Sequence, residues 1–155
     1  MTGWAGETTL DVEYAHALAP AASILLVETP VSETEGEAGF AQIVTAEEYA
    51  LAQYKVGVIS QSFAAAEQTF KNSAQLAPFR AAYTDAQSHK VTVLAGTGDT
   101  GATDYESNGT TLYSKQVAAW PATDPLVTAV GGTRSGLSTP PCTSWPRRTP
   151  RAWST

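Results

Sequence analysis

Apolar positions along this chain fall into two patterns, short continuous runs and runs with helical spacing. The continuous run at residues 91–95 predicts a buried strand of a parallel sheet. Apolar residues at helical spacing predict the buried side of a helix at Phe40, Ile43, Val44 and Leu51. In chain order, the predicted elements are a helix at 8–18, a strand at 23–28, a helix at 40–53, a strand at 56–62, a helical region at 64–88 interrupted near Pro78, and strands at 91–95 and 126–130. Strands that alternate with helices favour an α/β fold, a parallel sheet flanked by helices.

Two acidic residues, Glu7 and Asp11, stand four positions apart at the start of the first predicted helix. Positions i and i+4 share one helix face, so we expect the two carboxyl groups about 2.5–3.5 Å apart or joined by one water. Two like charges that close resist ionising together, and a carboxyl pair that shares a proton is a common general base in acid. An acidic pair at this spacing is also typical of a solvated helix face.

A third acid, Asp99, lies in the Gly-Asp-Thr-Gly string at 98–101, directly after the strand predicted at 91–95. Open α/β sheets place their sites at the carboxyl ends of strands, so Asp99 is a candidate site residue that should open into the same cleft as Glu7. The string also suits a tight turn, in which Gly takes positive φ and the Asp side chain bonds the backbone.

Four stretches, taken in their order and spacing, resemble the sedolisin family, the serine-carboxyl peptidases with a subtilisin-like fold. The stretches are Gly6-Glu7-x-x-x-Asp11; Ala19-Pro20-Ala21-Ala22 leading into residues 23–27; Val58-Ile59-Ser60-Gln61-Ser62-Phe63; and Gly98-Asp99-x-Gly101 followed by residues 121–133. The resemblance covers residues 3–133 and implies a subtilisin-like sheet. Two positions depart from the family pattern: Thr97 stands where Ser is more common, and Ala64 stands where Gly is.

The resemblance implies a role for each of the three acids. Glu7 would be the general base toward a Ser nucleophile, and Asp11 would support Glu7. Asp99 would donate a proton to the developing oxyanion. An acid at that place must be protonated to donate, which implies activity at low pH.

The resemblance also implies a polypeptide substrate. An extended peptide would lie by β-addition along the edge formed by Ser60, Ser62 and Phe63, and Asp104 would face its first pocket. The alternatives are an ordinary strand end at 60–63 and a plain loop carboxylate at Asp104.

The family's nucleophile lies in a Gly-Thr-Ser-x-x-x-Pro motif, and this sequence contains no Gly-Thr-Ser string. The nearest string ends at Ser135 and is interrupted by Arg134. From residue 125 onward the chain has no Asp or Glu and is rich in Arg, Pro, Ser and Thr. We therefore expect an incomplete, inactive peptidase domain at residues 1–133, truncated at both ends, and a disordered non-family tail at 134–155, as a shift of reading frame would give.

The composition of the chain limits which kinds of partner and which cellular compartment are expected. The chain has 155 residues and a net charge of −6, which argues against nucleic acid and anionic membranes as partners. The amino end lacks the basic and apolar run of a signal peptide, and no apolar stretch approaches the roughly 18 residues that span a bilayer. The resemblance implies an extracellular protein that binds calcium in the intact family domain, but this chain offers no calcium ligands that we can assign.

A non-enzymatic α/β module, either a pseudo-peptidase or a nucleotide binder, is the alternative function. Gly96-x-Gly98-x-x-Gly101 formally matches the dinucleotide-binding pattern. Such a site needs a helix that opens at Gly101, whereas the composition of residues 102–109 predicts a loop.

Overall fold

A three-stranded parallel sheet lies at the centre of the computed structural model, which describes residues 3–31, 33 and 37–132. The strand order is β1-β3-β5, with bounds β1 Val58–Gln61, β3 Thr92–Gly96 and β5 Thr128–Val130. In register, Ile59 lies opposite Val93, and Ala95 lies opposite Ala129. All three strands run in one direction, so their carboxyl ends share one edge of the sheet.

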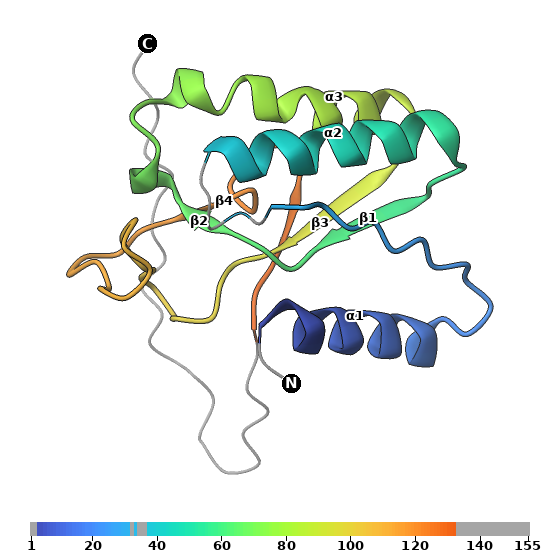
Figure 1. Ribbon diagram of the computed structural model, residues 1–155, viewed down its shortest axis with the longest axis horizontal. Helices are drawn as coiled ribbons and strands as arrows, with labels where there is room; N and C mark the ends of the chain where they lie inside the picture. Colours follow the sequence, from blue (N-terminus) through green and yellow to red (C-terminus); the bar gives the residue numbers. More distant parts are fainter. Residues whose placement is uncertain (1–2, 32, 34–36, 133–155) are drawn as a thin grey trace, which may run out of the picture.

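Helices lie on both sides of this sheet (Figure 1). Helices α2 (Glu37–Gln53) and α3 (Ala81–Ser88) pack together on one side, and α1 (Trp4–Leu18) lies on the other side. The predicted α/β class, a parallel sheet flanked by helices, is therefore confirmed. The predicted subtilisin-like topology is a finer statement that three strands do not test.

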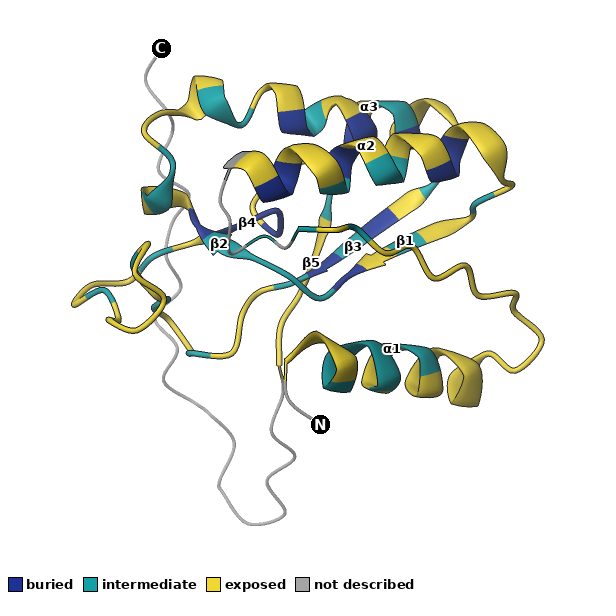
Figure 2. Ribbon diagram, viewed as in Figure 1, coloured by how far each residue is buried: buried dark blue, intermediate teal, exposed yellow. Residues whose placement is uncertain are grey.

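The buried side of α2 is the side that the apolar spacing predicts. Phe40, Val44 and Leu51 are buried, and Ile43 packs against the same cluster. Figure 2 shows the buried positions of α2 and α3 on the faces turned toward each other and toward the sheet. Helix α1 has no buried residue.

Trp120 is at the centre of the core. It belongs to β4 (Ala119–Trp120), which pairs antiparallel with β2 (Ala65–Ala66) in a separate two-stranded sheet. Its ring centroid lies 5.0 Å from Phe40 in an edge-on arrangement and 5.7 Å from Tyr83. The rings of Phe70 and Phe79 complete the cluster. Aromatic pairs in such arrangements contribute beyond their buried area.

The strand predicted at 23–28 is wrong, since the structure assigns no strand there. Its apolar side chains, Ile24, Leu25, Leu26 and Val27, are 42–51% exposed. A strand exists only by pairing with a neighbour, and this segment pairs with none of the described strands.

The helical region predicted at 64–88 is correct only at its end. After β2 the chain makes three short 3-10 turns, Glu67–Thr69, Ser73–Gln75 and Pro78–Arg80, before α3 begins at Ala81. The Asn72 side chain accepts from the Gln75 backbone N–H, and this local bond competes with a longer helix. Pro78 suits the first position of a helical turn but cannot continue one.

Removal of the Phe40 ring should open the aromatic core. We expect Phe40→Ala to lower the free energy of unfolding by about 3–5 kcal/mol, because Phe40 is fully buried against the rings of Phe63, Phe79 and Trp120. Urea unfolding followed by tryptophan fluorescence measures this change. Gln42→Ala, at an exposed position of the same helix, is the control and should change stability by less than about 0.5 kcal/mol.

Candidate active site

The carboxyl edge of the parallel sheet carries the candidate site. Ser62 follows β1 directly, Asp99 comes three residues after β3, and Gly131 follows β5. The Thr97 N–H donates to the Val130 carbonyl at 3.0 Å, so the ends of β3 and β5 remain joined at this edge. Asp99 therefore leaves the sheet where open α/β folds place their sites.

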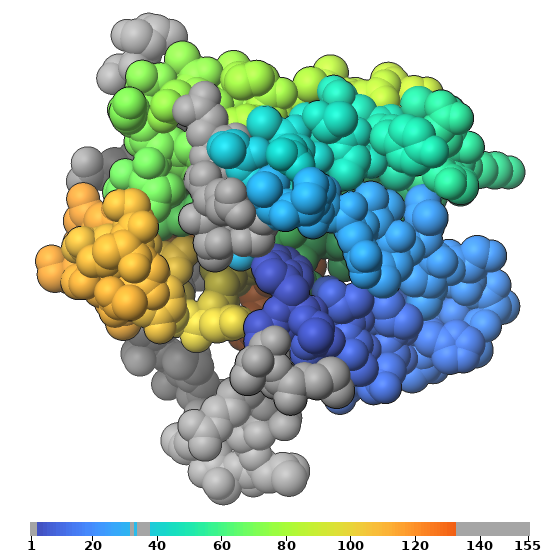
Figure 3. Space-filling model, in the orientation of Figure 1, coloured from blue at the N-terminus to red at the C-terminus, as the bar shows by residue number. Residues whose placement is uncertain are grey.

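Helix α1 brings Glu7 and Asp11 to the same edge. The two residues are one turn apart, with Glu7 half-buried and Asp11 exposed. The Ser62 hydroxyl donates to Asp11 Oδ1 at 2.9 Å, so Asp11 lies beside the carboxyl end of β1. In the space-filling view, the dark blue start of α1 and the yellow segment after β3 stand on either side of a hollow (Figure 3). The sharing of a proton between Glu7 and Asp11 stays a prediction.

The turn that holds Asp99 leaves its carboxyl group open. Gly98 and Gly101 have φ values of +95° and +75°, which residues with a side chain rarely adopt. Thr100 closes the turn by donating its hydroxyl to the Thr103 carbonyl at 2.6 Å. Asp99 is exposed, and its carboxyl group makes no hydrogen bond within the described residues. Glycine geometry and Thr100 thus form the turn without the Asp99 side chain.

Asp104, by contrast, serves its own loop. Its Oδ1 accepts from the Tyr105 backbone N–H at 2.7 Å, and its side chain is half-buried. A contact of Asp104 with a substrate pocket stays a prediction. The loop continues through a single antiparallel bridge between Tyr105 and Leu112, and the described structure has no helix after Gly101. A dinucleotide site therefore lacks the helix that it requires.

Some residues of segment 60–63, the proposed substrate-binding edge, lie at the surface and others pack in the core. Ser60 is exposed and Ser62 bonds Asp11, whereas Phe63 packs its ring 6.2 Å from Phe40. Between them, Gln61 is only 4% exposed. Substrate binding by this segment stays a prediction, and the observed contacts of Ser62 and Phe63 are structural ones.

A polar cluster lies behind this edge and consists of the half-buried Glu47 and the buried Gln61 and Tyr83. Gln61 Nε2 donates to Glu47 Oε1, and Gln61 lies 3.3 Å from the Tyr83 hydroxyl. Burial raises the pKa of Glu47 from 4.5 to about 7; the Gln61 hydrogen bond opposes this rise, and the nearby charge of Glu48 adds to it. Burial also raises the pKa of Tyr83.

Sequence reasoning missed this cluster, although the spacing of α2 contains the signal. Glu47 falls between Val44 and Leu51 on the buried side of the helix, so an acid occupies a core-facing position. Within the described part of the chain, Glu47 Oε2 is buried without a hydrogen-bond partner. Burying the protonated form of an acid in that position costs less free energy than burying the charged form.

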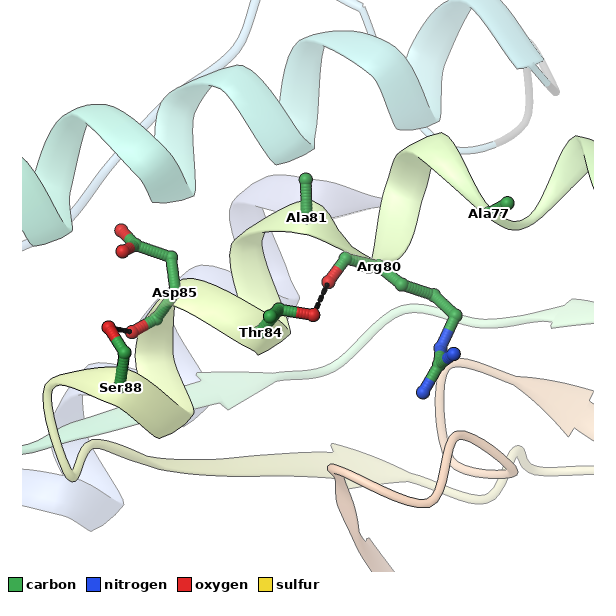
Figure 4. Close-up of a pocket in the computed structure, with 6 residues that line it drawn as sticks. All are labelled: Ala77, Arg80, Ala81, Thr84, Asp85 and Ser88. Atoms are coloured by element: carbon green, nitrogen blue, oxygen red, sulfur yellow. Dashed lines mark hydrogen bonds between the residues drawn. The ribbon is translucent and has the colours of Figure 1, made fainter.

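A second hollow, on the outer side of α3, has no comparable chemistry (Figure 4). Its Thr84 and Ser88 hydroxyls donate to backbone carbonyls of their own helix region. Its Arg80 reaches away to Asp124, with Nε 2.5 Å from Oδ2. Asp124 is buried and also accepts from the Leu126 N–H, so this ion pair fixes the turn before β5.

The chain is 38% identical over 129 residues to kumamolisin from Bacillus sp. (strain MN-32). The match covers 83% of this chain and 21% of kumamolisin, so the chain spans about a fifth of the length of this relative. No model of a known protein family matches the chain. Kumamolisin is a sedolisin, and the similarity supports a relationship between this chain and the sedolisin peptidases.

Glu47 should make the stability of the fold depend on pH. Its pKa is raised on folding, so its favourable contribution is complete below pH 4.5 and is lost as pH rises through about 7. The loss should be on the order of 3 kcal/mol, and Glu47→Gln should remove it. Urea unfolding between pH 4 and 8 measures the difference between wild type and variant.

Glu13→Gln is the control for this prediction, because Glu13 is an exposed acid on α1 and is not among the groups that raise the pKa of Glu47. The control should keep the wild-type dependence on pH. Parallel stability curves for wild type and Glu47→Gln would show that Glu47 titrates in the folded protein as it does in water.

Proposed function

We propose that this chain is part of the catalytic domain of a sedolisin-type serine-carboxyl peptidase that cleaves polypeptides at acidic pH. The observation that carries the proposal is the hydrogen bond from Ser62 to Asp11. This bond supports the proposal because it joins α1, which carries Glu7 and Asp11, to the residue that follows β1 at the carboxyl edge of the sheet. The similarity to kumamolisin supports the same function.

The three acids would divide the chemistry of acyl transfer. Glu7, half-buried on α1, would accept the proton of a serine hydroxyl, with Asp11 one turn away as its partner. Asp99, free of hydrogen bonds within the described residues, would donate a proton to the oxyanion that forms on the substrate carbonyl. Asp99 must keep its proton in order to donate it, so activity should fall as pH rises, whereas Glu7 must be ionised to act as the base.

The serine nucleophile would come from a segment with the Gly-Thr-Ser motif, which this sequence lacks. Without a nucleophile, only binding and oxyanion stabilisation remain, so the 155-residue chain alone should not turn over. Ser135 and the tail proposed at 134–155 lie outside the described residues.

Two further parts of the proposal, secretion and calcium binding, rest only on the similarity to sedolisins. We propose secretion, as for a sedolisin; in the described segments, no helix has the length and apolarity needed to cross a bilayer. Calcium would bind elsewhere in the intact domain. No group of three or more His, Cys, Asp or Glu residues in the described structure is placed to hold a metal ion, so we route no step through calcium.

A pseudo-peptidase is the second candidate, and the test must separate the two. The decisive protein is this chain extended by a family-type carboxyl-terminal segment with its Gly-Thr-Ser motif and by family-type amino-terminal elements. We expect the extended protein to cleave an unfolded polypeptide at pH 3–5 and the 155-residue chain to be inactive throughout. Failure of the extended, folded protein to cleave at any pH would favour the pseudo-peptidase.

Substitutions in the extended protein should identify the roles of the acids. Glu7→Gln should abolish turnover, and Asp99→Asn should lower kcat on the order of 10²–10³-fold, as for loss of one oxyanion donor. Glu13→Gln, an exposed acid on the same helix, is the control and should leave kcat unchanged. Steady-state kinetics measure all three. Full activity of Glu7→Gln would mean that the carboxyl pair is a solvated helix face.

A further inference from the structure

Ser62 joins two elements that are distant in the chain. Its hydroxyl donates to Asp11 Oδ1 across a separation of 51 residues. Ser62 is half-buried and Asp11 is exposed, so the bond lies at the margin of the contact between α1 and the sheet. A hydrogen bond to a charged acceptor is stronger than one between neutral groups.

Helix α1 depends on such bonds because its packing is sparse. None of its residues is buried, and Leu10, Tyr14 and Leu18 are 48%, 64% and 84% exposed. Its N-cap residue, Gly3, makes no side-chain capping bond. A helix of this length is marginal in water without tertiary contacts. The bond from Ser62 to Asp11 attaches the middle of the helix to the end of β1.

Ser62 is itself held from the opposite side of the sheet. The preceding residue, Gln61, is bonded to Glu47 of α2 and lies 3.3 Å from the Tyr83 hydroxyl of α3. Successive side chains of a strand point to opposite faces. The end of β1 is therefore fixed to α2 and α3 through Gln61, and it presents Ser62 to α1.

We propose that Ser62 is a positioning residue, whose hydroxyl fixes Asp11 and with it the carboxyl pair of α1 at the carboxyl edge of the sheet. This role differs from the substrate contact that the resemblance implies, because the Ser62 proton is already donated to Asp11. A role of Ser62 in catalysis rests on the proposed function, whereas its role in attaching α1 to the sheet is independent of that function.

Hydrogen exchange of the 155-residue chain tests the attachment directly. Ser62→Ala should raise the exchange rates of the α1 backbone amides by about 10- to 100-fold, an effect typical of one lost hydrogen bond to a charged group. Ser62→Thr keeps the hydroxyl and should restore the wild-type rates. Ser60→Ala is the control, because Ser60 is an exposed serine of β1 whose hydroxyl makes no hydrogen bond in the described structure, and it should leave the exchange rates of α1 unchanged.

A double-mutant cycle separates the bond from a general loosening of the protein. If the Ser62 hydroxyl acts through Asp11, Ser62→Ala should have no further effect on α1 exchange in an Asp11→Ala background. Equal effects of Ser62→Ala with and without Asp11 would overturn the proposal. So would unchanged exchange in Ser62→Ala, or failure of Ser62→Thr to restore it.

Kinetics of the extended peptidase then distinguish positioning from substrate contact. A positioning role predicts that Ser62→Ala lowers kcat with little change in KM and that Ser62→Thr restores kcat. A raised KM with unchanged kcat would show a substrate contact instead and would overturn the catalytic part of the proposal. If the extended protein cleaves nothing, the peptidase assignment fails, whereas the exchange data still decide whether Ser62 holds α1.

Discussion

The packing of Trp120 against four other aromatic rings is the contact on which the rest of the structure depends. It joins segments that are distant in the chain: Phe40 comes from α2, Tyr83 comes from α3, and Phe70 and Phe79 come from the turns between β2 and α3. A chain of this size has few such large side chains, so one cluster fixes the layer that covers the sheet.

The end of β1 connects the candidate site to the layer formed by α2 and α3, so the packing of that layer fixes the position of the site. Gln61 is anchored to Glu47 and Tyr83 within the covered face, and the next residue, Ser62, reaches the opposite face and Asp11. One strand end thus connects the packed core to the loosely packed helix α1. The alternation of side chains along a strand is what makes two adjacent residues serve two opposite layers.

The acidic groups in the core and in the candidate site would both suit a protein that functions at low pH. Glu47 is half-buried, its Oε2 is buried without a hydrogen-bond partner in the described structure, and desolvation raises its pKa to about 7. A protein that kept this side chain protonated would hold its core without an uncompensated charge. The proposed role of Asp99 requires a protonated carboxyl group as well, so the same range of pH would suit the core and this part of the site.

The sequence by itself determined the elements whose signals are local. Apolar spacing located the buried side of α2 at Phe40, Val44 and Leu51, and the continuous run at 91–95 located β3 within one residue. The spacing of Glu7 and Asp11 placed both on one helix, because the period of a helix depends on the backbone alone.

Tertiary structure decided everything that requires a partner. The apolar run at 23–28 forms no strand, since no described strand pairs with it, and the segment 64–88 is broken into a short strand, three turns and α3. Neither the contact of Ser62 with Asp11 nor the buried Glu47–Gln61 pair could be predicted, because each joins residues that only the fold brings together. Hydrophobic pattern specifies which face of an element is buried, but the identity of its neighbour depends on the packing of the whole chain.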